Sequence, residues 1–200
     1  MKHYLALPSL AAVMLSTAAY AAPEKQGYAG ARLGYGVASI DGNHGSKDLN
    51  INSMGAGAFV GFTRASDGLL SSSVRGELSF DYLTGSKKQN GATTTLGQSL
   101  AMIHLYNDFG AKDWKVKPFV GLGVGYAMPS YSVKAFGQKI DPKIEGSFAW
   151  AGAIGASYSV NEKWTADLGL RLTSVDTKAK SGAAFDYTDM TLTLGARYAF

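Results

Sequence analysis

The last twelve residues, DMTLTLGARYAF, alternate between two kinds of position. One series is apolar or aromatic, and the interleaved series is small or polar with a charge near each end. Side chains alternate between the two faces of a β-strand, so this pattern predicts a strand with one apolar face. The apolar series consists of Met190, Leu192, Leu194, Ala196, Tyr198 and Phe200.

The same alternation recurs along the chain and predicts eight strands. It is clear from Val74 to Tyr82 and from Trp164 to Leu172. Between about 97 and 109 the pattern is weaker, and we place Ile103 and Leu105 on the apolar face, opposite Met102, His104 and Tyr106. The predicted strands cover about residues 28–39, 53–64, 73–85, 95–109, 117–130, 146–160, 164–177 and 187–200.

The connections between these strands alternate in length. The shorter ones are RASDGLLSSS, GAKDWK and NEK. The longer and more polar ones are DGNHGSKDLN, GSKKQNGATT, SYSVKAFGQKIDPKIE and KAKSGAAFDY. Three short turns at one end and four longer loops at the other are typical of an outer-membrane barrel.

The first 21 residues have the features of a secretory signal peptide. A basic start at Lys2 precedes a short apolar run, and Ala19 and Ala21 form an A-x-A cleavage site. The run is too short for a spanning helix, which needs about 20 apolar residues. We therefore expect residues 1–21 to be removed and residues 22–200 to form one exported barrel domain. The chain has no cysteine, so disulfides do not stabilise it.

The position of the charges favours a barrel in a membrane over a sandwich in water. A soluble sheet would carry many Lys and Glu on its polar face, whereas here that face is rich in Gly, Ala and Ser. Inside a narrow barrel small residues make room, and opposite charges must pair because a lone buried charge is costly. Four arginines and four acids form this predicted lumen charge network: Arg32, Arg75, Glu77, Asp81, Asp167, Arg171, Asp189 and Arg197.

The aromatic residues predict two girdles at the membrane interfaces. One set lies near the short turns: Trp114, Phe119, Tyr158, Trp164, Tyr198 and Phe200. The other lies near the long loops: Tyr82, Tyr131, Phe148, Trp150 and Tyr187. If the final strand closes the sheet against the first, Phe200 reaches the periplasmic interface. Tyr198 and Phe200 then form a candidate signal for the barrel assembly machinery of Gram-negative bacteria.

Four stretches resemble the opacity-type family of small outer-membrane barrels: GYAGARLGYG, GELSFDYL, KPFVGLGVGYA and LTLGARYAF. The resemblance extends from about Gly27 to Phe200. It implies an eight-stranded antiparallel transmembrane β-barrel with four surface loops, an all-β fold. It also implies a role in adhesion or host-factor binding, carried by loops that vary, and it transfers no binding residue to this chain.

We find no convincing catalytic or metal site in the sequence. His44 lies in a polar loop without metal-ligand spacing, and His104 has no adjacent serine. The glycines at 121, 123 and 125 occupy alternate strand positions, so they are expected to make room in the barrel rather than bind phosphate. We expect no enzymatic activity, no metal and no cofactor.

The predicted loops carry candidate contact residues. Lysines there suit phosphates of lipopolysaccharide or acidic host glycans, and apolar residues suit a host surface protein or lipid. These candidates are Lys87, Lys88, Tyr131, Lys134, Phe136, Lys139 and Lys143. The net charge of +4, which falls by one to +3 without Lys2, does not point to nucleic acid. We therefore expect a non-enzymatic protein of the Gram-negative outer membrane. A small pore or carrier for apolar molecules and a lipid-modifying enzyme are the alternatives.

Overall fold

The computed structural model describes residues 25–42, 49–66, 72–89, 92–111, 113–135, 138–140, 146–178 and 184–200. The regular secondary structure in these ranges is β-strand. The strands are β1 (Lys25–Gly42), β2 (Leu49–Ser66), β3 (Ser72–Gln89), β4 (Ala92–Asp108), β5 (Val116–Ala135), β6 (Gln138–Ile140), β7 (Ser147–Ser159), β8 (Trp164–Lys178) and β9 (Ala184–Ala199). Over the same ranges, no helix has the length and apolar character needed to cross a membrane. The signal peptide predicted at 1–21 and the loop residue His44 lie outside the described residues.

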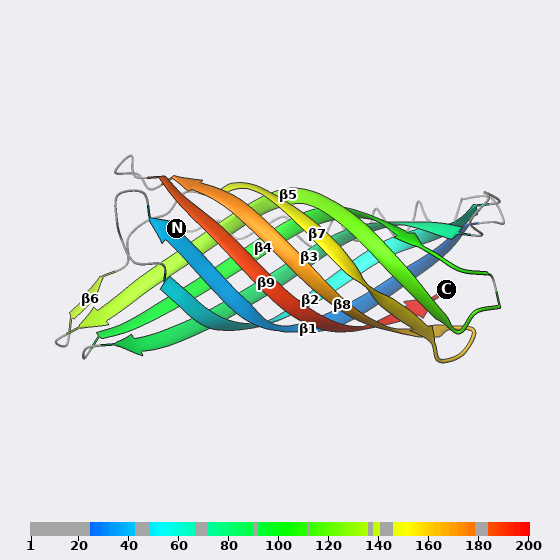
Figure 1. Cartoon of the computed structure of the whole chain (residues 1–200), viewed down its shortest axis with the longest axis horizontal. Coiled ribbons are helices and arrows are strands. Elements are labelled where there is room, and N and C mark those ends of the chain that lie inside the picture. The colour runs from blue at the N-terminus through cyan, green and yellow to red at the C-terminus, as the bar shows by residue number, and fades with distance from the viewer. Residues whose placement is uncertain are drawn as a thin grey trace, which may run out of the picture.

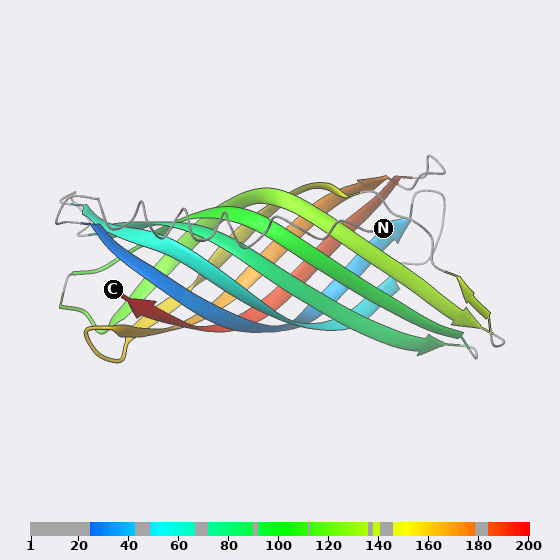
Figure 2. The ribbon, with the colours of Figure 1, turned by 180° about the vertical axis from the view of Figure 1, so that it is seen from behind.

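Eight long strands form one closed antiparallel sheet, and β6 is a short addition that pairs with the end of β5 (Figure 1). The sheet closes because β1 pairs with β9, in a register that runs from Tyr28 opposite Ala199 to Gly42 opposite Phe185. This confirms the predicted eight-stranded antiparallel barrel and the predicted pairing of the last strand with the first. The C-terminus and β6 lie at opposite ends of the barrel, as the view from behind also shows (Figure 2).

The register determines how far the strands tilt. Following cross-strand partners once around the barrel from Gly30 leads back to β1 at Ile40, ten residues further along. With strands about 4.8 Å apart and a rise of about 3.3 Å per residue, this offset over eight strands corresponds to a tilt of about 40°. A barrel of this size is narrow enough for its own side chains to fill.

The two faces of the sheet differ as the alternation predicts. The outer face carries large apolar side chains that are well exposed, including Leu122 at 72% and Leu33 at 65%. Exposed aromatic residues lie near both ends of the outer face, among them Tyr158, Trp164 and Tyr198 at one end and Tyr82, Phe148 and Trp150 at the other.

Two aromatic residues that we assigned to the girdles point into the barrel instead. Phe119 is buried, and Tyr187 packs against the buried apolar cluster. Both occupy the strand positions whose side chains face inward, next to Gly121 and Asp189 on the same face. Their placement is therefore decided by strand parity, that is, by whether a residue falls on the inward or the outward positions of the alternating strand. Their chemistry would suit a membrane interface equally well.

The strands are longer than predicted at the end that carries β6. Residues 85–94 were expected to form a long loop, yet pairing between β3 and β4 continues to Gln89 opposite Ala92. Both faces are polar there, so the alternation that marks a strand inside the membrane is lost while the backbone ladder continues. The 18 residues of β3, tilted by about 40°, span about 45 Å. An apolar band is only about 25 Å tall, so the barrel extends beyond it.

Candidate functional site

The barrel interior is a filled polar core rather than an open channel. All eight charged residues predicted for the lumen lie on its inner face, and seven of them form ion pairs. They come from strands far apart in sequence that the closed sheet brings around one axis. The eight are Arg32, Arg75, Glu77, Asp81, Asp167, Arg171, Asp189 and Arg197.

Arg32 on β1 forms the central cluster with two acids of β3. Its Nε and Nη2 atoms each donate to one carboxylate oxygen of Asp81 at 2.7 Å, and Nη1 donates to Oε1 of Glu77 at 2.7 Å. Arg171 Nη1 on β8 donates to Asp81 Oδ2 from the other side at 3.3 Å. Ser79 Oγ also donates to Asp81 Oδ2, at 3.1 Å. Asp81 thus joins three strands, and this arrangement fixes the side chains tightly.

Two further ion pairs lie towards the short-turn end. Arg75 donates to both oxygens of Asp108, from Nε at 2.6 Å and from Nη2 at 2.9 Å. Arg197 pairs with Asp167, with its Nε 2.7 Å from Oδ2 and its Nη2 donating to Oδ1 at 2.9 Å. Ser157 Oγ donates to Asp167 Oδ1 at 2.6 Å.

Asp108 is a fifth lumen acid that our sequence analysis missed. It continues the inward series of Met102, His104 and Tyr106 by one step, so strand parity alone could have found it. The predicted balance of four arginines and four acids is therefore incomplete. Asp189 differs from the other acids because its hydrogen bonds within the described residues come from the hydroxyls of Ser53, at 2.9 Å, and Thr191.

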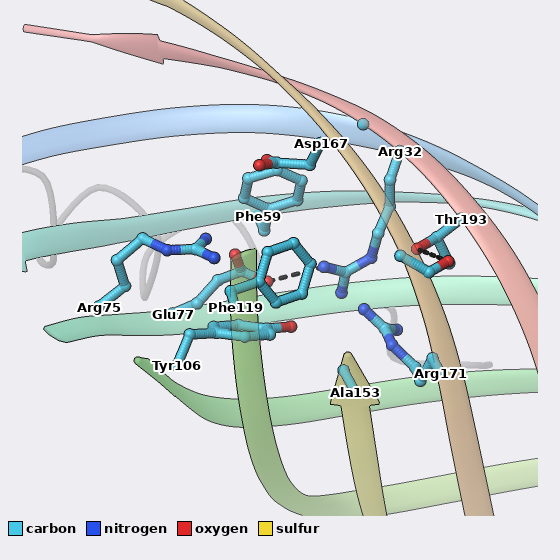
Figure 3. A pocket seen from close by; sticks show the side chains of 12 residues that line it. Arg32, Phe59, Arg75, Glu77, Tyr106, Phe119, Ala153, Asp167, Arg171 and Thr193 are labelled. Atoms are coloured by element: carbon cyan, nitrogen blue, oxygen red, sulfur yellow. Dashed lines mark hydrogen bonds and ion pairs between the residues drawn. The ribbon is translucent and has the colours of Figure 1, made fainter. Parts of the chain in front are cut away.

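Aromatic rings cover the guanidinium groups and complete the packing of the network. Arg75 lies 4.5 Å from the ring centre of Tyr106 and 5.2 Å from that of Phe119. Arg32 lies 5.0 Å from Phe59, on the neighbouring strand. Such contacts stabilise a cation where water is excluded. Figure 3 shows these rings and guanidinium groups around one small cavity.

The cavities that the described residues enclose inside the barrel are small. The cavity in Figure 3 has a volume of about 30 Å³, and a second one, beside Asp81 and Asp189, has about 20 Å³. Each is large enough for one or two water molecules. Towards the β6 end the interior also holds a buried apolar cluster of Leu83, Leu100, Met102, Ala127, Ala149, Ala151 and Val175. The buried polar side chains of Ser53, Gln98 and Asp189 lie beside this cluster. The interior therefore has a part dominated by ion pairs and, towards β6, a part in which apolar and polar side chains are mixed.

His104 lies among these interior side chains. It is 2% exposed, it stacks on Tyr106 with ring centres 5.6 Å apart, and its Nε2 has no hydrogen-bond partner among the described residues. A Cβ at Gly123 would collide with its imidazole, so this glycine makes the room that the sequence predicted. Within the described residues no group of His, Cys, Asp or Glu could hold a metal ion.

The loop contact candidates are described only in part. Lys87 and Lys88 lie near the end of β3 and are exposed, and Lys87 Nζ donates to the backbone oxygen of Asn50 at 3.1 Å. For Tyr131, Lys134 and Lys139 the structure gives a strand position alone. Phe136 and Lys143 lie outside the described residues.

At the opposite end, the two C-terminal aromatics face outward. Tyr198 packs on Trp164 with ring centres 5.1 Å apart, and the Phe200 backbone N–H donates to the oxygen of Gly27 at 3.0 Å. The terminal residue is thereby attached to the first strand.

Comparisons with known proteins place this geometry in context. The family model described as outer membrane protein beta-barrel domain matches residues 7–200. The barrel is similar to the solved structure of neisserial surface protein A, with 19% identity, 87% of this chain and 97% of that chain covered, and a TM-score of 0.57. It is also similar to Ail, the attachment invasion locus protein of Yersinia pestis, solved in complex with the heparin analogue sucrose octasulfate. There the identity is 17%, the coverage 88% and 99%, and the TM-score 0.52.

Two further comparisons limit what can be transferred. The outer membrane enzyme PagL aligns over 81% of this chain and 97% of its own, but at 12% identity and a TM-score of 0.45 that likeness carries no argument. A search of curated protein sequences gave no match. The structural neighbours therefore establish the fold and leave the activity to be argued from the site.

Proposed function

This chain belongs to the outer membrane protein beta-barrel domain family, and from that premise we propose that it is a non-enzymatic surface protein. Its rigid barrel carries loops that contact lipopolysaccharide, host factors or both, and so serve adhesion and envelope integrity. The family match and the shared fold confirm that the chain resembles small outer-membrane barrels, as the sequence indicated.

The filled interior is the observation that carries this proposal. Ion pairs at 2.6–3.3 Å and a buried apolar cluster occupy the lumen, and the described residues enclose cavities of about 30 and 20 Å³ between them. Because fixed side chains fill the interior, little room remains there for a ligand. Binding is then expected at the rim, where the strands extend beyond the apolar band.

The chemistry of the rim suits anionic partners. Lys87 and Lys88 are exposed at the end of β3. Lys134 on β5 and Lys139 on β6 follow in the same register, through Thr93 on β4, and the sequence adds Lys143. Lysines on such a rim attract phosphate and sulfate groups, more strongly at low salt. The heparin analogue bound in the Ail complex supports testing sulfated glycans first.

Loop replacement tests the proposal directly. Residues 136–145 are replaced by a Gly/Ser linker of equal length, and as a control residues 43–48 receive the same treatment. Binding of purified protein in vesicles to host cells and to immobilised heparin is measured at two salt concentrations. We expect the first replacement, and a Lys87→Glu/Lys88→Glu variant, to weaken binding while the barrel stays folded. If neither the replacement of 136–145 nor the Lys87→Glu/Lys88→Glu variant changes binding, the loop-based role is refuted.

The rival function is a small pore or carrier. The two interior cavities and the apolar layer near Leu100 favour a closed lumen over this alternative. Single-channel recording in planar bilayers tests it, and a stable, solute-selective conductance of the intact protein would replace our proposal with a channel.

A lipid-modifying enzyme is the third possibility, with His104 as its base. The lipid substrate lies outside the barrel, whereas His104 is enclosed between Tyr106 and Gly123 inside it. Mass spectrometry of lipopolysaccharide incubated with the protein checks this directly. A change in acylation that disappears in His104→Ala would show that the protein is an enzyme.

A further inference from the structure

One ion pair joins opposite walls of the barrel. Arg171 on β8 donates from Nη1 to Oδ2 of Asp81 on β3 at 3.3 Å. Strands β3 and β8 are four steps apart in either direction around the closed sheet. The other ion pairs between described residues join strands that are adjacent or two steps apart. Arg171 and Asp81 therefore brace the lumen across its full width.

This brace is the weakest contact of the charge network. At 3.3 Å it is the longest of the ion pairs between described residues, and it uses a single N–H of a guanidinium that has several. The buried Nε of Arg171 has no hydrogen-bond partner among the described residues. Asp81 still accepts two hydrogen bonds of 2.7 Å from Arg32 if Arg171 leaves. Loss of the brace therefore leaves Asp81 paired.

A second acid lies within reach of the same guanidinium. Arg171 is the cross-strand partner of Thr191, and Asp189 is two residues from Thr191 on β9. Such diagonal neighbours are about 7–8 Å apart, a distance that a long side chain can span. Asp189 is 2% exposed, and among the described residues it accepts hydrogen bonds from the hydroxyls of Ser53 and Thr191 alone. It is therefore a buried acid that lacks a guanidinium partner in that part of the chain.

The surroundings of Arg171 allow a change of partner. The cavity of about 20 Å³ is lined by Arg171, Asp81 and Asp189 together. In Figure 3 the guanidinium groups of Arg171 and Arg32 point toward one another, so a move of Arg171 to Asp189 separates two like charges. It also keeps the guanidinium beside a carboxylate inside the lumen. The two positions thus differ by one long hydrogen bond and not by a charge left alone.

We propose that Arg171 is a brace with two positions. On Asp81 it ties β8 to β3 across the lumen. On Asp189 it ties β8 to its neighbour β9, and no ion pair between described residues then crosses the barrel. The change releases two opposite walls from one another while the backbone pairing of the sheet stays intact. It concerns the lumen alone and does not depend on the loop-based role proposed above.

Crystal structures of two variants test the proposal. Asp81→Asn removes the carboxylate that holds the brace. Glu77→Gln is the matched control, since it neutralises the neighbouring acid on β3 and leaves both acids within reach of Arg171 in place. We expect Arg171 to contact Asp189 in Asp81→Asn and to stay on Asp81 in Glu77→Gln. Arg171 remaining apart from Asp189 in the Asp81→Asn structure would overturn the proposal.

Unfolding in urea measures the same contact in vesicles. Asp189→Asn should lower the folding equilibrium constant by about fivefold or less in the wild type. In the Asp81→Asn background it should lower that constant by more than about tenfold, because Asp189 is then the acid that pairs with Arg171. Equal effects of Asp189→Asn in the two backgrounds would contradict a change of partner.

A measurement on the wild type keeps the proposal open to refutation if Asp81→Asn assembles poorly. Exchange between the two positions should broaden the side-chain N–H signals of Arg171 in nuclear magnetic resonance, and relaxation dispersion detects such motion on the microsecond-to-millisecond timescale. Arg171→Lys assigns these signals. We expect the broadening to vanish in Asp189→Asn and to persist in Glu77→Gln. A wild type without exchange, or one whose exchange survives in Asp189→Asn, would show that Arg171 does not move to Asp189.

Discussion

Replacing Arg32 by methionine should destabilise the barrel strongly, because it removes the centre of the lumen network. Three hydrogen bonds of 2.7 Å join this guanidinium to Glu77 and Asp81. Asp81 keeps Arg171 and Ser79 after the change, but Glu77 loses the partner that its ion pair supplies. Breaking a buried ion pair by removing one partner costs about 3–5 kcal/mol, because the remaining charge stays buried.

The matched control removes a lumen charge that has no guanidinium partner among the described residues. Asp189→Asn keeps an acceptor for the hydroxyls of Ser53 and Thr191, so we expect a change within about 1 kcal/mol. A second variant, Arg32→Met/Glu77→Gln, removes the orphaned charge as well. It should recover at least about 1 kcal/mol of the loss, since the two sites are coupled.

Equilibrium unfolding in urea, in vesicles of fixed composition, measures these differences through the fluorescence of the three tryptophans. All three are exposed on the barrel, so their emission reports transfer between lipid and water. The reasoning fails if Arg32→Met costs no more than Asp189→Asn, or if Glu77→Gln restores nothing in the double variant. Either result would mean that hydration by water, rather than the charge of Arg32, stabilises the carboxylates of Glu77 and Asp81.

Three other changes test separate features. Gly123→Ala should destabilise the barrel by about 1–3 kcal/mol, because its Cβ collides with the imidazole of His104; an unchanged urea midpoint would contradict this. Arg75→Lys should lower the free energy of unfolding by about 1.5–3 kcal/mol, since lysine cannot form the bidentate contact that Arg75 makes with Asp108. Urea unfolding measures this change as well, and an unchanged midpoint would contradict it. Deleting Phe200 should slow assembly by the barrel assembly machinery in vitro by severalfold while the finished barrel keeps its urea midpoint; equal assembly rates would remove its role as a signal.

Strand alternation, together with the placement of the charges, was sufficient to predict the fold. The final strand and the segment around Leu170 each present one continuous apolar face, and in the structure those faces are exposed to the outside. The inward position of Arg32 and Arg171 follows from the same parity. The sequence could not supply their partners, because Arg32 meets Asp81 two strands away only through the registers of β1–β2 and β2–β3. Those registers depend on the whole circuit of eight strands.

The errors also have physical causes. Phe119 and Tyr187 were placed by their chemistry, which suits a membrane interface, although strand parity put both inside. The polar segment 85–94 was assigned to a loop because alternation vanishes once both faces of a strand meet water. Hydrogen bonding between backbones needs no such pattern, and β3 and β4 continue to pair through Lys87 opposite Thr94.

The arrangement of the interior explains why function is expected at the rim. Ion pairs fill the short-turn part of the lumen, and the buried cluster around Leu100 and Val175, together with Gln98 and Asp189, fills the part towards β6. An ion entering from either side would have to displace closely packed apolar side chains or paired guanidinium groups, and both steps are costly in a space this small. The same packing holds the strands in fixed register beyond the membrane band. The ends of β3, β4 and β5 therefore form a rigid support for the loops. Loop residues attached to this support can vary in sequence while their positions stay constrained.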